Sequence, residues 1–487
     1  MPISLLKIFK IVAEISKKSK IPAYVVGGYA RDILLGQDRK KDIDFVVAGS
    51  GLTFARLFDE GMKQTGSLIE FTDFDTARYV IGEGGEQMIL EFAGARAEAY
   101  RGESRKPAVT AATLEQDLSR RDFTVNAIAV PVELFTKKYS LATLKKNLVD
   151  PFNAQKDLKD KILRTPLDPD LTFSDDPLRM LRAIRFAAQL KFSIEPQTLE
   201  SIYKNRNRLK IVSAERIQEE LIKMLATSEP SVALVLLFQT HLMDAILPEV
   251  SKLDGVEEIF GHQHKNNLIH TFKVVDNIAV ASPNVWLRFA GLLHDIGKPG
   301  TKKFVPKIGW TFHAHEHLGK KMVYTIARRL KLSKERADYV AKLVRWHMQP
   351  IALMDEGITD SAVRRLVVTM GPELDDLLIL GKGDITTGNP YKKDKRLKNY
   401  DRLKAKIAEV LERDKLRAFQ SPIRGDEIML ACQLKPGPTV GKIKEAIEEA
   451  ILDGKIPNEY EAAKVYFKEI KDEYLKSARE WERVKNN

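Results

Sequence analysis

The chain has 487 residues, of which 44% are hydrophobic and 30% charged, with a formal net charge of +12 and one cysteine. This composition excludes a disordered chain and an internal disulfide, and since no run of about 18 apolar residues occurs, no membrane span is predicted. The length indicates several domains. The positive net charge suits a polyanionic partner such as nucleic acid, and the single cysteine fits a cytoplasmic protein.

Residues 1–165 alternate strand-like and helical patterns, which predicts a mixed sheet with helices packed on one side. The strand-like runs are Ala23–Val26, Ile43–Val47, Ala77–Ile81 and Met88–Phe92. The first run ends at Gly27 and Gly28, and a helical pattern follows directly. Glycines after a strand allow close approach to a phosphate, and the start of a helix supplies free N–H groups. The pair is therefore a candidate phosphate site, although an isolated glycine pair is usually a simple turn.

Asp42 and Asp44 lie two residues apart at the second run, so their side chains point the same way from the sheet. Carboxylates that share a face beside a phosphate site suit divalent metal ions, which can activate a hydroxyl and hold a triphosphate. Glu91, between apolar residues of the fourth run, is a candidate third ligand. An ordinary edge-strand glutamate is an equally good interpretation of Glu91.

A short span before the apolar segment Ala127–Val130 is crowded with polar residues. They are Asp117, Arg120, Arg121, Asp122 and Asn126. Arginine matches the geometry of phosphate oxygens, and Asp or Asn can bind ribose hydroxyls. Such a cluster is usually a solvated face, but the apolar segment that follows predicts that part of it is held at the edge of the core.

The next segment has a helical pattern. Asp176, Arg179, Arg182 and Arg185 recur in it at intervals of three, which places them on one helix face. Taken alone, this pattern is typical of an amphipathic helix with ion pairs. We interpret the following helical pattern, Ala214–Thr227, as packing rather than chemistry.

Histidines in the middle of the chain are accompanied by acidic residues. The candidate metal ligands are His270, His294, Asp295, His315, His347 and Asp384. Histidine is a frequent ligand of divalent metals, and an Asp next to a His can bridge two ions. One histidine on a helix is usually structural, whereas this set predicts a metal centre, beside which Lys298 is a candidate phosphate contact.

Residues beyond 389 are strongly basic and predict a long helix with one charged face. The later stretch 436–444, PGPTVGKIK, places backbone N–H groups and lysines near a helix start. Such a helix start suits a phosphate, so this region is a candidate for phosphate contact.

Three motifs together resemble the signature of class II nucleotidyltransferases, the tRNA nucleotidyltransferases (CCA-adding enzymes) and bacterial poly(A) polymerases. They are GGYARD followed by DIDFVV, RRDFTVNAIA, and DPLRMLRAIRF. Two further motifs, HDIGKP and FHAHEHLG, resemble HD-domain phosphohydrolases. The resemblance implies a multidomain, mostly helical protein with an α/β, polymerase β-like head. The implied domains are a nucleotidyltransferase head at 1–165, a helical neck at 166–240, an HD-type helical body at 241–390 and a basic, helical, tRNA-binding tail at 391–487.

The resemblance also implies roles for the candidate residues. Asp42 and Asp44 would hold two Mg²⁺ ions, and the histidine-rich centre would hold a transition metal or Mg²⁺. Asp176 and Arg179 would pair with the Watson–Crick edge of an incoming cytosine or adenine. The residues implied in contacts with the nucleotide sugar and phosphates are Gly27, Gly28, Arg31, Arg121, Asp122, Arg182 and Arg185.

The implied function is template-independent addition or repair of the 3′-terminal CCA of tRNA from CTP and ATP, without a membrane partner. Poly(A) polymerase, or a specialist that adds only CC or only A, shares the motifs and remains open, as does the oligomeric state. From a different class, an HD phosphohydrolase with a degenerate polymerase half also remains open, as does an HD domain kept only for packing and tRNA binding.

Overall fold

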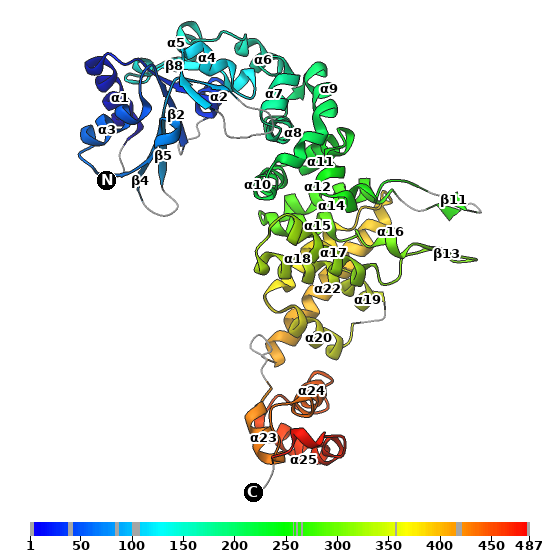
Figure 1. The fold of residues 1–487 in the computed structure, drawn as a ribbon. Coiled ribbons are helices and arrows are strands. Elements are labelled where there is room, and N and C mark those ends of the chain that lie inside the picture. The colour runs from blue at the N-terminus through cyan, green and yellow to red at the C-terminus, as the bar shows by residue number, and fades with distance from the viewer. Residues whose placement is uncertain are drawn as a thin grey trace. The chain divides into compact units, whose positions relative to one another are not determined.

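The structure is a computed structural model of the chain (Figure 1). It describes residues 4–37, 42–82, 87–99, 108–256, 258–259, 262–263, 266–355, 358–414 and 421–484. The chain forms two compact units, 1–251 and 252–487. In neither unit does a described helix combine the length and the apolar character needed to span a bilayer.

The first unit contains a mixed six-stranded sheet with the order β3-β4-β5-β2-β1-β8. Its strands are β1 Ala23–Val26, β2 Asp42–Val47, β3 Ser67–Phe71, β4 Thr76–Ile81, β5 Met88–Gly94 and β8 Ala129–Pro131. The parallel pair is β2 with β5, and the other neighbours are antiparallel. The four predicted runs are confirmed as β1, β2, β4 and β5 to within two residues at each end, and the outer strands β3 and β8 are additional to them.

One face of this sheet is covered by helices, among them α1 and α3 (Figure 1). Phe45 of β2 and Phe92 of β5 point to this face and stack with ring centroids 5.0 Å apart, and Phe58 of α3 packs 5.0 Å from Phe92. Because side chains alternate along a strand, Asp44 and Glu91 point to the opposite face. The aromatic core under the helices therefore fixes which way the acidic residues face.

Helices make up the rest of the first unit. They are α1 Leu5–Ser19, α2 Gly27–Leu34, α3 Gly51–Gly61, α4 Leu114–Ser119, α5 Leu141–Asn147, α6 Ala154–Asp160, α7 Pro169–Asp175, α8 Leu178–Leu190, α9 Pro196–Asn205, α10 Ala214–Leu225, α11 Pro230–Gln239, α12 Leu242–Ile246 and α13 Pro248–Ser251. Two small pairs of strands accompany them: β6 Arg96–Ala99 with β7 Ala108–Ala111, and β9 Ile162–Leu163 with β10 Ser193–Ile194. Helix α8 packs against α10 and α11, which anchors the helix that carries the repeated arginines.

The second unit is almost wholly helical. Its helices are α14 Asn267–Ala281, α15 Val285–Leu293, α16 Lys298–Thr301, α17 His315–Arg329, α18 Lys334–Trp346, α19 Gln349–Asp355, α20 Asp360–Met370, α21 Leu374–Gly383, α22 Pro390–Asp414, α23 Gly425–Cys432, α24 Pro438–Leu452 and α25 Tyr460–Lys476. Two short hairpins join them, β11 Glu258–Ile259 with β12 His262–Gln263, and β13 Lys303–Val305 with β14 Gly309–Thr311. The predicted long basic helix is α22, with 25 residues.

The start of α24, which we predicted for phosphate contact, is engaged by the chain's own carboxylate. The Thr439 backbone N–H donates to Glu482 Oε1 at 2.8 Å, and the Thr439 hydroxyl lies 3.1 Å from Glu482 Oε2. A Cβ atom at Gly437 would come within 2.7 Å of the same carboxylate, which explains the glycine. The start of α24 therefore binds the C-terminal segment around Glu482. This contact joins residues far apart in the chain, so the local sequence does not reveal it.

Candidate active site and metal centre

A cavity of about 770 Å³ in the first unit is lined by all nine predicted nucleotide-binding residues. Gly27 lies at its floor, where β1 turns into α2 with a positive φ of +68°. A Cβ atom there would lie 3.0 Å from Asp44 Oδ2 and 3.3 Å from Arg121 Nη1. Only glycine combines this backbone conformation with so close an approach, so the turn can bring free N–H groups next to the carboxylate.

Asp44 and Glu91 face this cavity from neighbouring strands. They are direct partners in the parallel register of β2 and β5. Asp42 lies two residues earlier on the same face of β2, but it is not among the residues that line the cavity. Water reaches the Asp44 side chain, but the cavity walls shield it from bulk solvent. This burial, together with the charges of Glu91 and Asp42, raises the pKa of Asp44 to about 6. Asp44 and Glu91 thus present two carboxylates to the cavity, a type of ligand that suits a divalent cation.

Arg121 is held at the cavity by a buried acid. Asp117 is fully buried in the first turn of α4 and pairs with Arg120 at 2.7 Å and with Arg121 at 3.1 Å. The second Asp117 oxygen therefore fixes the Arg121 guanidinium beside Gly27. This contact gives Arg121 a defined position from which to bind a phosphate.

Asp122 and Arg31 belong to one buried network. Asp122 accepts hydrogen bonds from Arg182 Nε at 2.8 Å and from Asn126 Nδ2 at 2.9 Å, and Asn126 Oδ1 accepts one from Arg31 at 2.7 Å. Burial alone would raise the pKa of Asp122, but the Arg182 charge and the Asn126 hydrogen bond lower it to about 2. Both Asp122 and Arg31 thus orient other cavity residues, most directly Arg182.

Arg185 lines the cavity but is largely engaged by protein. Its Nε lies 2.6 Å from Glu220 Oε2, and its guanidinium lies 4.0 Å from the Phe186 ring centroid. The Arg185 residue is 8% exposed and Glu220 is 3% exposed. This pair links α8 to α10, and removal of either partner would leave the other charge buried and unpaired.

Asp176 and Arg179 stand at the start of α8, where the cavity opens. The Leu178 backbone N–H donates to Asp176 Oδ1 at 3.2 Å, and Arg179 Nη2 donates to the Arg120 carbonyl at 2.6 Å. Arg216 of α10 approaches Asp176 Oδ2 at 3.4 Å. The predicted shared helix face is wrong for Asp176, which lies in extended backbone between α7 and α8, whereas Arg179 belongs to α8. Both residues line the cavity, and separate partners hold their side chains.

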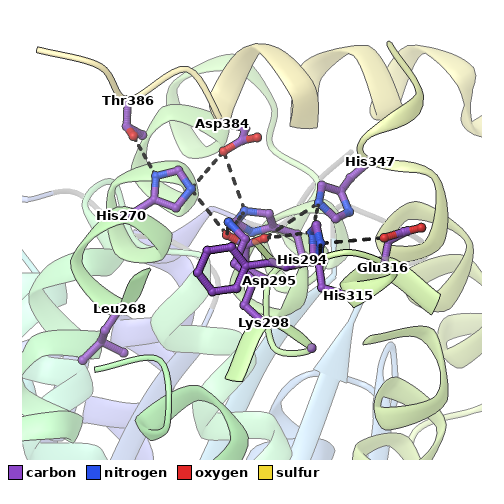
Figure 2. Close-up of polar contacts among 12 residues, drawn as sticks. Leu268, His270, His294, Asp295, Lys298, His315, Glu316, His347, Asp384 and Thr386 are labelled. Carbon is purple, nitrogen blue, oxygen red and sulfur yellow. Dashed lines mark hydrogen bonds and ion pairs between the residues drawn. The ribbon is translucent and has the colours of Figure 1, made fainter. Parts of the chain in front are cut away.

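The six candidate metal ligands of the second unit converge at the ends of helices (Figure 2). Two triads form, each with ligand atoms within 4.8 Å of one another: His270, His294 and Asp384 in the first, Asp295, His315 and His347 in the second. Asp295 joins the triads. Its Oδ2 lies 3.2 Å from His294 Nε2, and its Oδ1 lies 3.4 Å from His315 Nε2. One carboxylate oxygen therefore faces each triad, as a bridge between two ions requires.

The histidine rings are oriented for metal binding by their second nitrogen. Nδ1 of His294, His315 and His347 lies 2.7–2.8 Å from a backbone carbonyl oxygen. A carbonyl can only accept, so Nδ1 carries the proton and the Nε2 lone pair faces the centre. Burial lowers the pKa of His347 to about 4, which keeps its ring neutral. Among the described residues, His294 Nε2 and Asp295 Oδ1 are buried without a hydrogen-bond partner, so the residues present fit a divalent metal.

Three family models match successive parts of the chain. The Poly A polymerase head domain matches residues 23–164, the probable RNA and SrmB-binding site of polymerase A matches 191–253, and the HD domain matches 267–379. The A-adding tRNA nucleotidyltransferase of Deinococcus radiodurans is 32% identical over 358 residues, covering 72% of this chain and 78% of the relative. The chain belongs to the tRNA nucleotidyltransferase and poly(A) polymerase family.

Other members of this family support the assignment. The Multifunctional CCA protein of Pseudomonas fluorescens is 33% identical over 331 residues, covering 66% of this chain and 74% of the relative. A crystal structure of the Bacillus stearothermophilus CCA-adding enzyme with CTP superposes with a TM-score of 0.64 at 21% identity, covering 98% of this chain and all of the other. That likeness establishes the fold. The predicted family and fold class are thus confirmed, and this nucleotidyltransferase combines two types of domain that depend on metals.

Two residues of the nucleotidyltransferase site were missed from the sequence. Arg216 and Glu220 lie on α10, which we interpreted as packing, yet Arg216 lines the cavity at Asp176 and Glu220 engages Arg185. They are four residues apart, so they share the helix face that meets α8. The available signal was that Arg216 and Glu220 are both charged, although they lie on the face of the helix that was expected to pack.

Proposed function

We propose that this nucleotidyltransferase adds or repairs the 3′-terminal CCA of tRNA, using CTP and ATP and releasing pyrophosphate in the cytoplasm. The observation that carries the proposal is one cavity lined both by the acidic strand residues Asp44 and Glu91 and by Asp176 and Arg179. Relatives named for CCA and A addition support the choice of tRNA and of these nucleotides. The head, neck, body and tail limits at residues 165, 240 and 390 remain part of the proposal, with the tail holding the tRNA.

In the proposed reaction the RNA 3′-oxygen forms a bond to the α-phosphorus of the nucleotide, and the bond to the β-phosphate oxygen breaks. Asp42 and Asp44, with Glu91 as a further candidate, would hold Mg²⁺, which supplies charge neutralisation and activation of the hydroxyl. Gly28 and Arg121 would bind the phosphates through backbone N–H and guanidinium groups. Alignment and charge neutralisation would then account for most of the rate gain.

Base choice would rest on Asp176 and Arg179. A carboxylate accepts from an exocyclic amine, and a guanidinium donates to a ring nitrogen or carbonyl oxygen. Cytosine and adenine both present an amine beside an acceptor, whereas uracil has no exocyclic amine and guanine places a carbonyl where adenine has its amine. One pair of side chains can therefore accept both correct bases and reject the other two.

The proposal is tested with tRNA that lacks its last three nucleotides, supplied with CTP and ATP separately and together. We expect two additions of C, then one of A, then a stop, read on a sequencing gel. Addition of A alone that continues would indicate a poly(A) polymerase. Addition of only CC, or of A only to a tRNA that already ends in CC, would indicate a specialist.

Replacement of Arg216 by methionine should weaken base selection. The Asp176–Arg216 contact is half exposed and worth under about 1 kcal/mol, so we expect kcat/KM for CTP and ATP to fall by up to about fivefold. Incorporation of UTP should rise relative to CTP, because the Asp176 carboxylate loses one of its anchors. Lys191→Met, which changes an exposed cation of the same unit, is the control, and equal behaviour of the two variants would remove Arg216 from the site.

A second function, metal-dependent phosphohydrolysis, is favoured by the ligand geometry of the HD domain. His270, His294 and Asp384 would hold one ion, Asp295, His315 and His347 the other, and metal of this kind activates water for attack on a phosphate when bound. Lys298 lies 2.5 Å from Asp295 Oδ2 and would bind a phosphate oxygen beside the bridge. A transition metal suits the nitrogen-rich ligands better than Mg²⁺.

A further inference from the structure

Opposite its aromatic core, the sheet of the first unit has a face whose described residues include the catalytic candidates and an exposed apolar patch. We propose that the outer part of this face, which we call the β3–β5 face and define by Ile69, Phe71, Arg78 and Glu91, binds the 3′ end of the RNA primer. The inference rests on the proposed nucleotidyl transfer and adds to it the place where the acceptor strand lies.

The strand register makes this face continuous with the cavity. Asp44 of β2 pairs with Glu91 of β5, Glu91 pairs with Arg78 of β4, and Arg78 pairs with Ile69 of β3. Directly paired residues project to the same side of a sheet, so these four side chains form one row. Phe71 follows two residues after Ile69 and joins the same face. A strip of side chains therefore runs from the acidic site to the outermost strand.

The chemistry of the strip matches a single-stranded nucleic acid. Ile69 is 46% exposed and Phe71 is 40% exposed, although both are large apolar residues. The Arg78 guanidinium lies 5.9 Å from the Phe71 ring centroid and 3.2 Å from Glu91. An exposed aromatic ring beside a guanidinium can stack on a base and bind the adjoining phosphate, which is how single strands are held without strong sequence preference.

The position of the strip also favours the primer over the nucleotide. Asp44 has Val26 of β1 as its partner on one side and Glu91 on the other. Gly27 and Arg121, the candidate phosphate contacts, lie on the β1 side. The attacking and leaving oxygens of a phosphoryl-type transfer lie roughly in line on opposite sides of phosphorus. With the triphosphate on the β1 side, the attacking 3′-hydroxyl comes from the β5 side, over this strip.

The test compares full-length variants in steady-state addition of C to tRNA lacking CCA. Phe71→Ala should raise the KM for tRNA by about tenfold, the range of one lost base stack, and leave the KM for CTP within about twofold. Phe71→Trp should restore the tRNA KM, since any flat ring can stack. Tyr139→Ala is the matched control, because Tyr139 is an aromatic residue of the same unit that is 39% exposed. A tRNA with 4-thiouridine at its 3′ end should crosslink to the peptide that contains Phe71.

The outcomes separate this inference from the function on which it rests. A wild-type protein that adds no nucleotide to tRNA would overturn the proposed function itself. If the wild-type protein is active but Phe71→Ala and Tyr139→Ala have the same KM for tRNA, only the proposed primer surface is overturned. An equal rise of both KM values, or a change of oligomeric state in Phe71→Ala without a change in the tRNA KM, would likewise assign the face to another role.

Discussion

Replacement of Asp44 by asparagine will lower nucleotide addition to tRNA by at least about 10³-fold. The substitution keeps the shape of the side chain but removes the charge that would hold a cation between Glu91 and the triphosphate, and metal-borne charge stabilisation is worth several kcal/mol. Single-turnover addition of C to tRNA lacking CCA measures the loss. Binding of the tRNA, followed by fluorescence anisotropy, should stay within about twofold of the wild type.

The control for Asp44 is Asp73→Asn, which changes an exposed acid of the same unit and should leave the rate unaltered. Asp42→Asn should resemble Asp44→Asn, because the two residues share a sheet face. An Asp44→Asn protein that keeps more than about a tenth of the wild-type rate would show that the chemistry does not run through this carboxylate. The Gly27 turn beside it would then serve only structure.

Alternation along a strand is a local rule, and it was enough to place Asp42 and Asp44 on one face. Whether Glu91 joins them depends on the parallel register of β2 with β5, which pairs residues 47 positions apart in the chain (91 − 44). No local pattern fixes that register, so the ligand and edge-strand interpretations of Glu91 were equally good. The structure places Glu91 at the cavity, and its pairing with Arg78 leaves the ligand role a proposal.

Charged residues on helices show the same limit. The spacing of Asp176 and Arg179 predicted a shared helix face, but Asp176 lies in extended backbone just before α8, and the two residues meet only as lining of the same cavity. Their partners Arg216 and the Arg120 carbonyl come from other elements, as does the Glu482 carboxylate that engages α24. Helical periodicity tells which residues share a face but not which face meets another helix, so such partners appear only in three dimensions.

The metal centre of the second unit was accessible from the sequence for a different reason. Several histidines occur with acidic residues in this part of the sequence, and few purely structural roles require so many histidines. What the sequence could not supply was the division into two triads and the position of Asp295 between them. That geometry sets the expectation for the second large effect.

Replacement of Asp295 by asparagine, or of His315 by alanine, should remove bound metal from the HD domain and lower phosphohydrolysis by at least about 10²-fold. Asp295 faces both triads, and His315 faces one. Removal of a direct metal ligand should lower metal affinity at least as much as removal of a residue that only hydrogen-bonds to a ligand. Metal content is measured by mass spectrometry, and hydrolysis of bis(p-nitrophenyl) phosphate is followed after reconstitution with Ni²⁺, Mn²⁺ or Mg²⁺.

The matched control is His317→Ala, two residues along the same helix. The His317 side chain is 58% exposed, whereas that of His315 is 7% exposed and faces the centre, so only the latter should bind metal. Addition of CCA to tRNA should be unchanged in all three variants, because the candidate residues for nucleotide binding and chemistry belong to the first unit. Loss of metal without any phosphohydrolase activity in the wild type would assign the centre to stability alone. Equal metal content in the His315 and His317 variants would mean that the cluster binds no ion at this position.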